Sequence, residues 1–508
     1  MSSQPQLARV IPRAEHSVSR AHISPDALRV LYRLREAGFQ AFLVGGCVRD
    51  LLLGLTPKDF DVATDALPEQ VKRLFRNCRL VGRRFRLAHV FFGRETIEVA
   101  TFRAQAAPPP GEEMDELPFE GDEDDGGEGD DAAADGDVDG NVLEPEPEPQ
   151  EAAPEINFNR RFEPNDVDHV VDQHGRILRD NIYGTIDDDV WRRDFTINAL
   201  YYNIADFSIW DYAGGVEDLA ARRLRLIGDP DTRFREDPVR MLRAARFEAK
   251  LDFMVDPGTA SAIDSLRHLL AGVPPARLFD ETLKLFLTGH GERSLEVLRA
   301  RKLLPALLPP VADCLERLPG SPVEKLLVRG LQNTDARVRA DKTVTPGFLF
   351  ALLLYGPVGM AIEKAPPQRW TEIDTIFDAV ETAVRAVQAR ISLPRRFSLA
   401  VRDMFALQPR LEAPRGRRAL RTLEHPRFRA AYDLLLLRAE FGMAQAQVAE
   451  WWTRLQQVPP AEREALAEAT AGPRTGGAPG APGAPGAPGA SRGRRRRRGR
   501  GGAPRAAN

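Results

Sequence analysis

Residues 104–165 are rich in Pro, Gly, Asp and Glu and poor in apolar side chains. A segment of this composition cannot bury enough apolar surface to offset the entropy lost on ordering. Alternating helix and strand patterns precede it, and an α/β pattern resumes around Ile182 and over 195–204. We therefore expect one mixed α/β unit, assembled from both sides of a disordered surface insertion.

The charge of the chain is divided unevenly along the sequence. The segment between Arg103 and Arg160 holds 20 Asp and Glu and no Lys or Arg, so the chain's net charge of −3 leaves +17 on the remainder. Nine arginines and no acid follow Glu468, with five consecutive arginines at 494–498 behind a flexible Ala-Pro-Gly repeat. A basic body with an Arg-rich tail indicates a polyanionic partner, most simply nucleic acid, against the alternative of a merely solvated basic surface.

Composition also disfavours several classes of protein. The three cysteines are far apart in the sequence, so no disulfide framework or cysteine zinc site is expected, and a reducing compartment is indicated. The N-terminus lacks the apolar core of a signal peptide. The longest apolar run, 348–362, contains Gly and Pro and is too short to span a bilayer. We expect a cytoplasmic protein with no membrane partner.

Local patterns predict the elements and their grouping. A helix starts at Ser24-Pro25 and ends at Gly38, and the following segments are predicted as strand 41–44, helix 48–53, strand 60–63, helix 69–76 and hairpin 88–102. From Pro238 onward the pattern is helical, with predicted helices at 239–250, 275–287, 291–301, 322–331, 348–354, 370–390, 396–406 and 427–455. The expected division is a flexible tail 1–22, a head 23–215, a neck 216–275, a helical body 276–460 and a flexible linker with a basic tail 461–508.

The clearest chemical constellation is a Gly-Gly turn followed by paired carboxylates. Asp59 and Asp61 are two apart in a predicted strand, so their side chains share a face and can hold Mg²⁺. The turn ending in Gly46 lets backbone amides approach a phosphate, and Arg49 adds a cation. Glu98, between apolar neighbours in a predicted strand, is a possible third carboxylate, and the alternative is an exposed edge-strand charge.

Two further segments carry charged residues in a defined order. Asp194 follows Arg193 in an Arg-Arg-Asp sequence, which on its own also fits a salt-bridged helix cap. Asp237 precedes a proline-opened helix and lies three residues before Arg240, with Arg243 one turn further on the same face. An acceptor beside a guanidinium can bond the edge of a base, whereas spacing alone favours a surface ion pair.

Together these segments resemble the class II nucleotidyltransferases, which comprise tRNA CCA-adding enzymes and bacterial poly(A) polymerases. The resemblance covers roughly 22–460 and is carried by 45–54 with Asp59-x-Asp61, by Arg-Arg-Asp-Phe-Thr-Ile-Asn at 192–198, and by Arg-Glu-Asp-Pro-Val-Arg-Met-Leu-Arg-Ala at 235–244. It implies an α+β fold, with a small mixed-sheet nucleotidyltransferase head followed by all-α neck and body domains. The acidic insert departs from the family pattern and must loop out.

The resemblance also implies roles for residues. Asp59 and Asp61 would hold two Mg²⁺ ions, and Asp194 would complete the catalytic carboxylates, with Glu98 as its rival. The nucleotide-binding residues would be Gly46, Arg49, Arg193, Asp237, Arg240 and Arg243. ATP would be the substrate.

The branch within the family is indicated by Leu-Val-Gly-Arg-Arg-Phe-Arg-Leu-Ala-His-Val at 80–90, which is similar to the signature of bacterial poly(A) polymerases. The segment 423–433 also resembles their C-terminal region. The expected reaction is template-independent addition of AMP from ATP to RNA 3′ ends, with RNA-degradation machinery as a further partner. CCA addition to tRNA is the alternative within the family. A catalytically silent RNA-binding protein is the alternative from another class, disfavoured by the intact Asp59 and Asp61.

Overall fold

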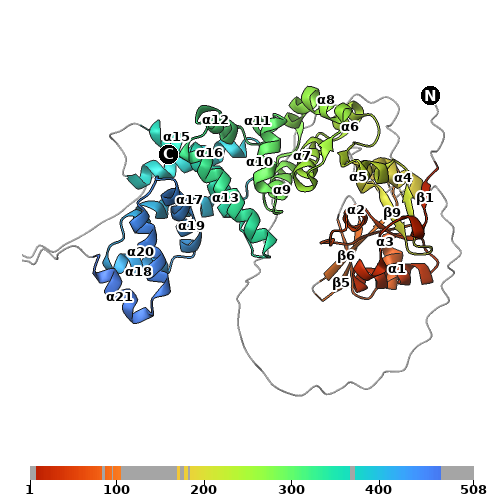
Figure 1. The fold of residues 1–508 in the computed structure, drawn as a ribbon, viewed down its shortest axis with the longest axis horizontal. Helices are drawn as coiled ribbons and strands as arrows, with labels where there is room; N and C mark the ends of the chain where they lie inside the picture. The colour runs from red at the N-terminus through yellow and green to blue at the C-terminus, as the bar shows by residue number, and fades with distance from the viewer. Residues whose placement is uncertain are drawn as a thin grey trace, which may run out of the picture.

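The computed structural model describes residues 7–82, 86–93, 95–104, 169–171, 177–180, 183–365 and 372–470. Nearly all of the predicted acidic insert, Ile182, residues 83–85 of the branch signature and the Arg-rich tail lie outside the described residues. The remainder is an α+β structure. It runs from a sheet-containing head at one end, through the neck helices, to the helical body at the other end (Figure 1).

The head is built around a mixed eight-stranded sheet with the strand order β1-β10-β9-β2-β3-β6-β5-β4. Only β3 and β6 run parallel, and every other neighbouring pair is antiparallel. Its strands are β1 Arg9–Ile11, β2 Ala41–Val44, β3 Asp61–Thr64, β4 Cys78–Val81, β5 Leu87–Phe92, β6 Glu95–Thr101, β9 Leu200–Asn203 and β10 Ile209–Asp211. The strands β2 and β9 join the chain before the insert to the chain after it.

Helices cover the two faces of this sheet to different extents. One face packs on α1 Pro25–Glu36 and α3 Pro68–Leu74 and belongs to the large core that continues into the neck and body. The opposite face forms a smaller cluster that includes Phe42, Val44 and Tyr201 and is covered by α4 Ile186–Arg192. This smaller cluster does not reach the first residue of β3, so polar side chains can occupy the same face there.

The first residues of the chain correct one prediction. Residues 1–22 were expected to form a flexible tail, but β1 pairs with β10, and Ile11 and Val18 are buried. Two short 3₁₀ turns, Arg13–Glu15 and Arg20–His22, complete this segment. A three-residue edge strand with isolated apolar anchors is too short to produce a periodic signal, which is why the sequence pattern missed it.

Two small sheets lie apart from the main one. The strands β7 His169–Val171 and β8 Ile177–Asp180 pair with each other. At the start of the neck, β11 Arg223–Leu224 pairs in parallel with β12 Met254–Val255.

The helices of the neck and body follow the proline and glycine punctuation of the sequence. Seven of the eight predicted helices are present, although α13 extends well beyond residue 331. The remaining helices of the described chain are α2 Gly46–Leu52, α5 Gly215–Ala220, α6 Pro230–Glu236, α7 Val239–Leu251, α8 Pro257–Leu266, α9 Pro275–Phe286, α10 Gly291–Ala300, α11 Leu304–Leu307, α12 Pro309–Arg317, α13 Pro322–Arg339, α14 Pro346–Leu353, α15 Tyr355–Glu363, α16 Glu372–Gln388, α17 Arg395–Glu412, α18 Gly416–Leu423, α19 Phe428–Glu440, α20 Ala446–Gln457 and α21 Pro460–Glu468.

Two predictions for the body are wrong. The single helix expected over 427–455 is two helices, α19 and α20, because Gly442 adopts a left-handed φ of 72° between them. The expected flexible linker from residue 461 is contradicted for its first residues, because α21 is a helix that packs against α18 and α20.

No single helix in the described parts of the chain is long and apolar enough to cross a membrane. The helices α14 and α15 meet such a test only as a pair, by length and composition, and they are bent by 45° relative to each other.

Candidate active site

A line of polar residues crosses the sheet on the face that α4 only partly covers. Glu98 on β6 lies directly opposite Asp61 at the start of β3, and His89 on β5 lies opposite Glu98. The Nε2 atom of His89 is 4.0 Å from Oε2 of Glu98, whose side chain is 44% exposed. The strand neighbours of Glu98, Ile97 and Val99, are buried in the core. The sheet register therefore brings Asp61 and Glu98 together.

The position of Asp59 differs from the prediction. Asp59 was expected to share a strand with Asp61, but β3 begins at Asp61, and Asp59 lies exposed in the segment before it. Pro57 and the bend at Lys58 precede the start of strand pairing, in keeping with the missing amide donor of proline. Asp59 is nonetheless close enough for its charge to act on Asp61.

Negative charge accumulates at this corner of the sheet. Burial raises the pKa of Asp61 to about 6, with further contributions from the charges of Glu98 and Asp59, while Arg193 opposes the rise. A divalent cation would relieve this repulsion, and carboxylate oxygens are the ligands that Mg²⁺ prefers. Among the described residues, no group of three or more His, Cys, Asp or Glu could hold a metal by itself. A cation here would therefore need further ligands, such as substrate phosphates.

The predicted phosphate turn lies beside these carboxylates, at the end of β2. Gly45 has φ 78° and ψ −130°, a conformation that favours glycine, and α2 begins at Gly46. Arg49 does not project from the turn: the residue is 2% exposed, and its Nη1 donates to Oδ1 of Asn198 at 2.6 Å. A Cβ built on Gly46 would lie 3.5 Å from Nη2 of Arg49, so this guanidinium, which is also paired with Asp50 at 2.7 Å, lies close to the turn.

Arg193 reaches the same turn from the end of α4. A Cβ built on Gly45 would lie 3.7 Å from Nη1 of Arg193. The side chain of Arg193 is 24% exposed, and its charge lowers the pKa of Asp61. The guanidinium groups of Arg49 and Arg193 therefore both lie close to the glycine turn, the first near Gly46 and the second near Gly45.

Asp194 occupies a different electrostatic environment from Asp61. Its Oδ2 accepts from Nε of Arg243 at 2.7 Å and lies 2.5 Å from Nη2 of the same guanidinium. Burial alone would raise the pKa of Asp194, but the charge of Arg243 and hydrogen bonds from Arg243, the Phe195 amide and Asn198 outweigh it and lower the pKa. Asp194 thus joins the Arg-Arg-Asp segment to α7, with its charge already paired.

The third predicted segment forms the junction of α6 and α7. Asp237 accepts from the Val239 amide at 3.3 Å, but the N-cap position of α7 is Pro238, and Asp237 ends α6. Asp237 and Arg240 do not pair with each other. Asp237 accepts from Nη2 of Arg277 on α9 at 2.9 Å, and Nη1 of Arg240 donates to the Arg233 carbonyl at 2.8 Å and to Glu236 at 3.0 Å. Arg277 carried no sequence signal, because it lies 40 residues further along the chain.

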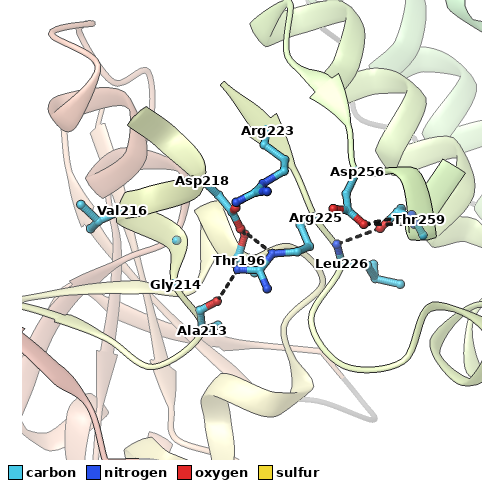
Figure 2. A network of polar contacts seen from close by, with 12 residues as sticks. Thr196, Ala213, Gly214, Val216, Asp218, Arg223, Arg225, Leu226, Asp256 and Thr259 are labelled. Atoms are coloured by element: carbon cyan, nitrogen blue, oxygen red, sulfur yellow. Dashed lines mark hydrogen bonds and ion pairs between the residues drawn. The ribbon is translucent and has the colours of Figure 1, made fainter. Parts of the chain in front are cut away.

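A polar network centred on a buried aspartate joins the head to the start of the neck (Figure 2). Asp218 on α5 is fully buried and accepts from Thr196 Oγ1 at 2.6 Å, Arg223 Nε at 2.7 Å and Arg225 Nε at 2.8 Å. The backbone is continuous with this network, because the Thr196 amide donates to the Arg225 carbonyl. The segment that carries Arg193 and Asp194 is therefore tied to the neck through Thr196.

Comparison with known proteins places the chain in a family. Residues 41–225 match the family described as "Poly A polymerase head domain", 252–315 match "Probable RNA and SrmB- binding site of polymerase A", and 368–501 match "Polymerase A arginine-rich C-terminus". The "Poly(A) polymerase I" of Escherichia coli O6:H1 is 43% identical over 475 residues, covering 93% of this chain and 90% of the relative. The chain belongs to the bacterial poly(A) polymerase I family.

The similarity to CCA-adding enzymes is lower and covers less of the chain. The "CCA-adding enzyme" of Bacillus subtilis is 32% identical over 277 residues, which is 54% of this chain and 54% of the relative. The solved structure titled "Structure of tRNA-processing enzyme complex 3" shares 19% identity with a TM-score of 0.51 and covers 87% of this chain and 99% of its own, which shows a common fold. Like its poly(A) polymerase I relatives, the chain is a polynucleotide adenylyltransferase that adds AMP to RNA without a template, and it binds RNA and nucleotides.

Proposed function

We propose that Asp59, Asp61 and Glu98 form the catalytic carboxylate set, with Asp59 and Asp61 holding two Mg²⁺ ions. The observation that carries this assignment is the register of Glu98 opposite Asp61, together with the raised pKa of Asp61. Neither Asp61 nor Glu98 has a Lys or Arg ion pair within the described residues, whereas Asp194 does. Glu98 is therefore favoured over Asp194 as the third carboxylate.

The chemistry that follows is transfer of AMP from ATP to the RNA 3′-hydroxyl with release of pyrophosphate. Two bound Mg²⁺ ions would lower the pKa of the attacking hydroxyl and stabilise the charge on the triphosphate and leaving group. Gly46 lets the backbone approach the phosphates, and Arg49 and Arg193 place positive charge on two sides of them. The contribution of the chain is positioning and charge stabilisation.

Base selection is assigned to the start of α7, as the family resemblance implies. Asp237 offers a carboxylate oxygen and Arg240 a guanidinium, each held by its own partner rather than by the other. Such prior fixing favours one pattern of donors and acceptors on the incoming base, because a wrong base leaves buried polar groups unpaired. Arg243 has Nε and Nη2 committed to Asp194, so its contribution would be to hold α7 against the nucleotide site.

The rest of the chain supports RNA handling. We propose the domain division stated above, with the head starting at residue 7 and the body ending at α21. RNA 3′ ends would bind along the basic body and tail, in the cytoplasm, with RNA-degradation machinery as a partner.

The direct test is incubation of the purified protein with a non-tRNA oligoribonucleotide, Mg²⁺ and each nucleoside triphosphate in turn. A long tail from ATP alone supports the proposal. Two CMP additions followed by one AMP on tRNA, with no long tail from ATP, would instead identify a CCA-adding activity. Asp61→Asn is the matched inactive control.

A further inference from the structure

Arg193 is held along one edge of its guanidinium by two side chains. Nη2 of Arg193 donates to Oδ2 of Asp189 at 2.8 Å, and Nε lies 3.2 Å from the same oxygen. The Nε atom also donates to the hydroxyl of Tyr201 at 2.7 Å. That hydroxyl donates in turn to Oδ2 of Asp189 at 2.7 Å, so the three side chains form a closed set of contacts.

The surroundings restrict this set to one arrangement. Tyr201 is fully buried on β9, and the guanidinium carbon of Arg193 lies 5.1 Å from the centre of its ring. Asp189 is one helical turn before Arg193 on α4, and its side chain is only 14% exposed. Burial would lower the pKa of Arg193, but its electrostatic interactions and hydrogen bonds with Tyr201 and Asp189 reverse this and raise it. The charged guanidinium is thus stabilised where it lies.

The opposite edge of the guanidinium faces the proposed reaction site. Nη1 lies against Gly45, and Tyr201 is paired in the sheet with Val44, which is paired in turn with Asp61. The register of the same sheet therefore positions both Tyr201, which holds Arg193, and the carboxylate of Asp61. An unrestrained arginine loses rotamer entropy when a ligand immobilises it, and prior fixing avoids that loss.

We propose that Asp189 and Tyr201 are positioning residues that hold Arg193 with Nη1 directed at the triphosphate of ATP. The proposal rests on the phosphate contact proposed above for Arg193. A purely structural role for the two residues would affect stability and all ligands alike, whereas a positioning role affects only ligands that carry the triphosphate.

The first test is Tyr201→Phe, which removes one hydroxyl and keeps the buried ring. Its matched control is Tyr202→Phe on the same strand, because the Tyr202 hydroxyl is buried without a hydrogen-bond partner among the described residues. We expect Tyr201→Phe to raise the Kd and KM for ATP about three- to tenfold, since one hydrogen bond is lost. AMP affinity and melting temperature should stay near wild type, and Tyr202→Phe should leave all of them unchanged.

Asp189→Asn and a double-mutant cycle sharpen the result. Asp189→Asn should weaken ATP binding about tenfold or more, because a charge-assisted contact is lost. In an Arg193→Ala background neither Tyr201→Phe nor Asp189→Asn should weaken ATP binding further. If Arg193→Ala loses ATP affinity while both positioning variants keep it, the positioning role is overturned and the phosphate contact stands. If Arg193→Ala itself keeps ATP affinity, the proposed contact is overturned and the positioning role with it.

Discussion

Two buried or partly buried carboxylates in this molecule show opposite electrostatics. Asp61 lies beside Glu98 and Asp59, and its pKa is raised to about 6 by burial and by those charges. Asp194 lies against Arg243, and its pKa is lowered despite burial. The difference shows that the neighbouring strands and helices decide whether the pKa of a motif aspartate is raised or lowered.

The largest expected effect comes from neutralising one carboxylate of the proposed catalytic set. Asp61→Asn or Glu98→Gln should lower kcat by about a thousandfold or more, because several kcal/mol of transition-state stabilisation are lost. Single-turnover AMP addition at saturating Mg²⁺ measures it.

The control is Glu36→Gln on α1, which removes the same single negative charge at an exposed position and should keep full activity. Near-normal turnover of Glu98→Gln would remove Glu98 from the catalytic set.

Neutralising Asp194, the carboxylate paired with Arg243, should mainly lower the free energy of unfolding. Asp194→Asn leaves the guanidinium of Arg243 partly buried without its counter-charge, which is expected to cost about 3 kcal/mol of unfolding free energy. Urea unfolding of Asp194→Asn and of the double variant Asp194→Asn/Arg243→Met measures it. The double variant should recover part of the loss, and an Asp194→Asn protein as stable as wild type would contradict the ion-pair assignment.

The pH dependence of stability should separate the two carboxylates in metal-free buffer. The folded pKa of Asp61 lies above its unfolded value, so its contribution is present at low pH and is lost as pH rises through about 6. Asp61→Asn should therefore gain about 1–2 kcal/mol relative to wild type between pH 5 and pH 7.5. Asp194 has the opposite sign, because its lowered pKa gives stability that is lost only as pH falls. Parallel curves for wild type and Asp61→Asn would contradict the raised pKa.

Asp237 is a third case, paired with Arg277 but nearer the surface. Its side chain is 24% exposed and that of Arg277 is 53% exposed, so the pair adds little stability. Asp237→Ala should instead lower the ratio of ATP to CTP incorporation, by about tenfold, with little change in melting temperature. An unchanged ratio would place base selection elsewhere.

Local patterns predicted much of this fold and part of the site. The strand at Ala41–Val44 and the hairpin of β5 and β6 were predicted because buried runs and a glycine turn are local signals. Glu98 was singled out because a carboxylate between apolar strand neighbours needs a reason. Its position opposite Asp61 depends on strand order, which no local pattern encodes.

The remaining partners could not be predicted for the same reason. Arg277, Asp189 and Tyr201 act through contacts set by the packing of separate elements, and each looks like an ordinary helix or strand residue in sequence. The break at Gly442 was available as a signal, since a glycine within a long helical pattern favours a helix end.

The central claim is that Glu98, not Asp194, completes the cation site with Asp61. Titration of Mn²⁺, a spin-detectable substitute for Mg²⁺, into wild type, Glu98→Gln and Asp194→Asn in the presence of a non-hydrolysable ATP analogue tests it directly, at a temperature where all three are folded. The account predicts that Glu98→Gln weakens Mn²⁺ binding about tenfold or more, whereas Asp194→Asn stays within about threefold of wild type. Wild-type affinity in Glu98→Gln with loss of binding in Asp194→Asn would contradict it.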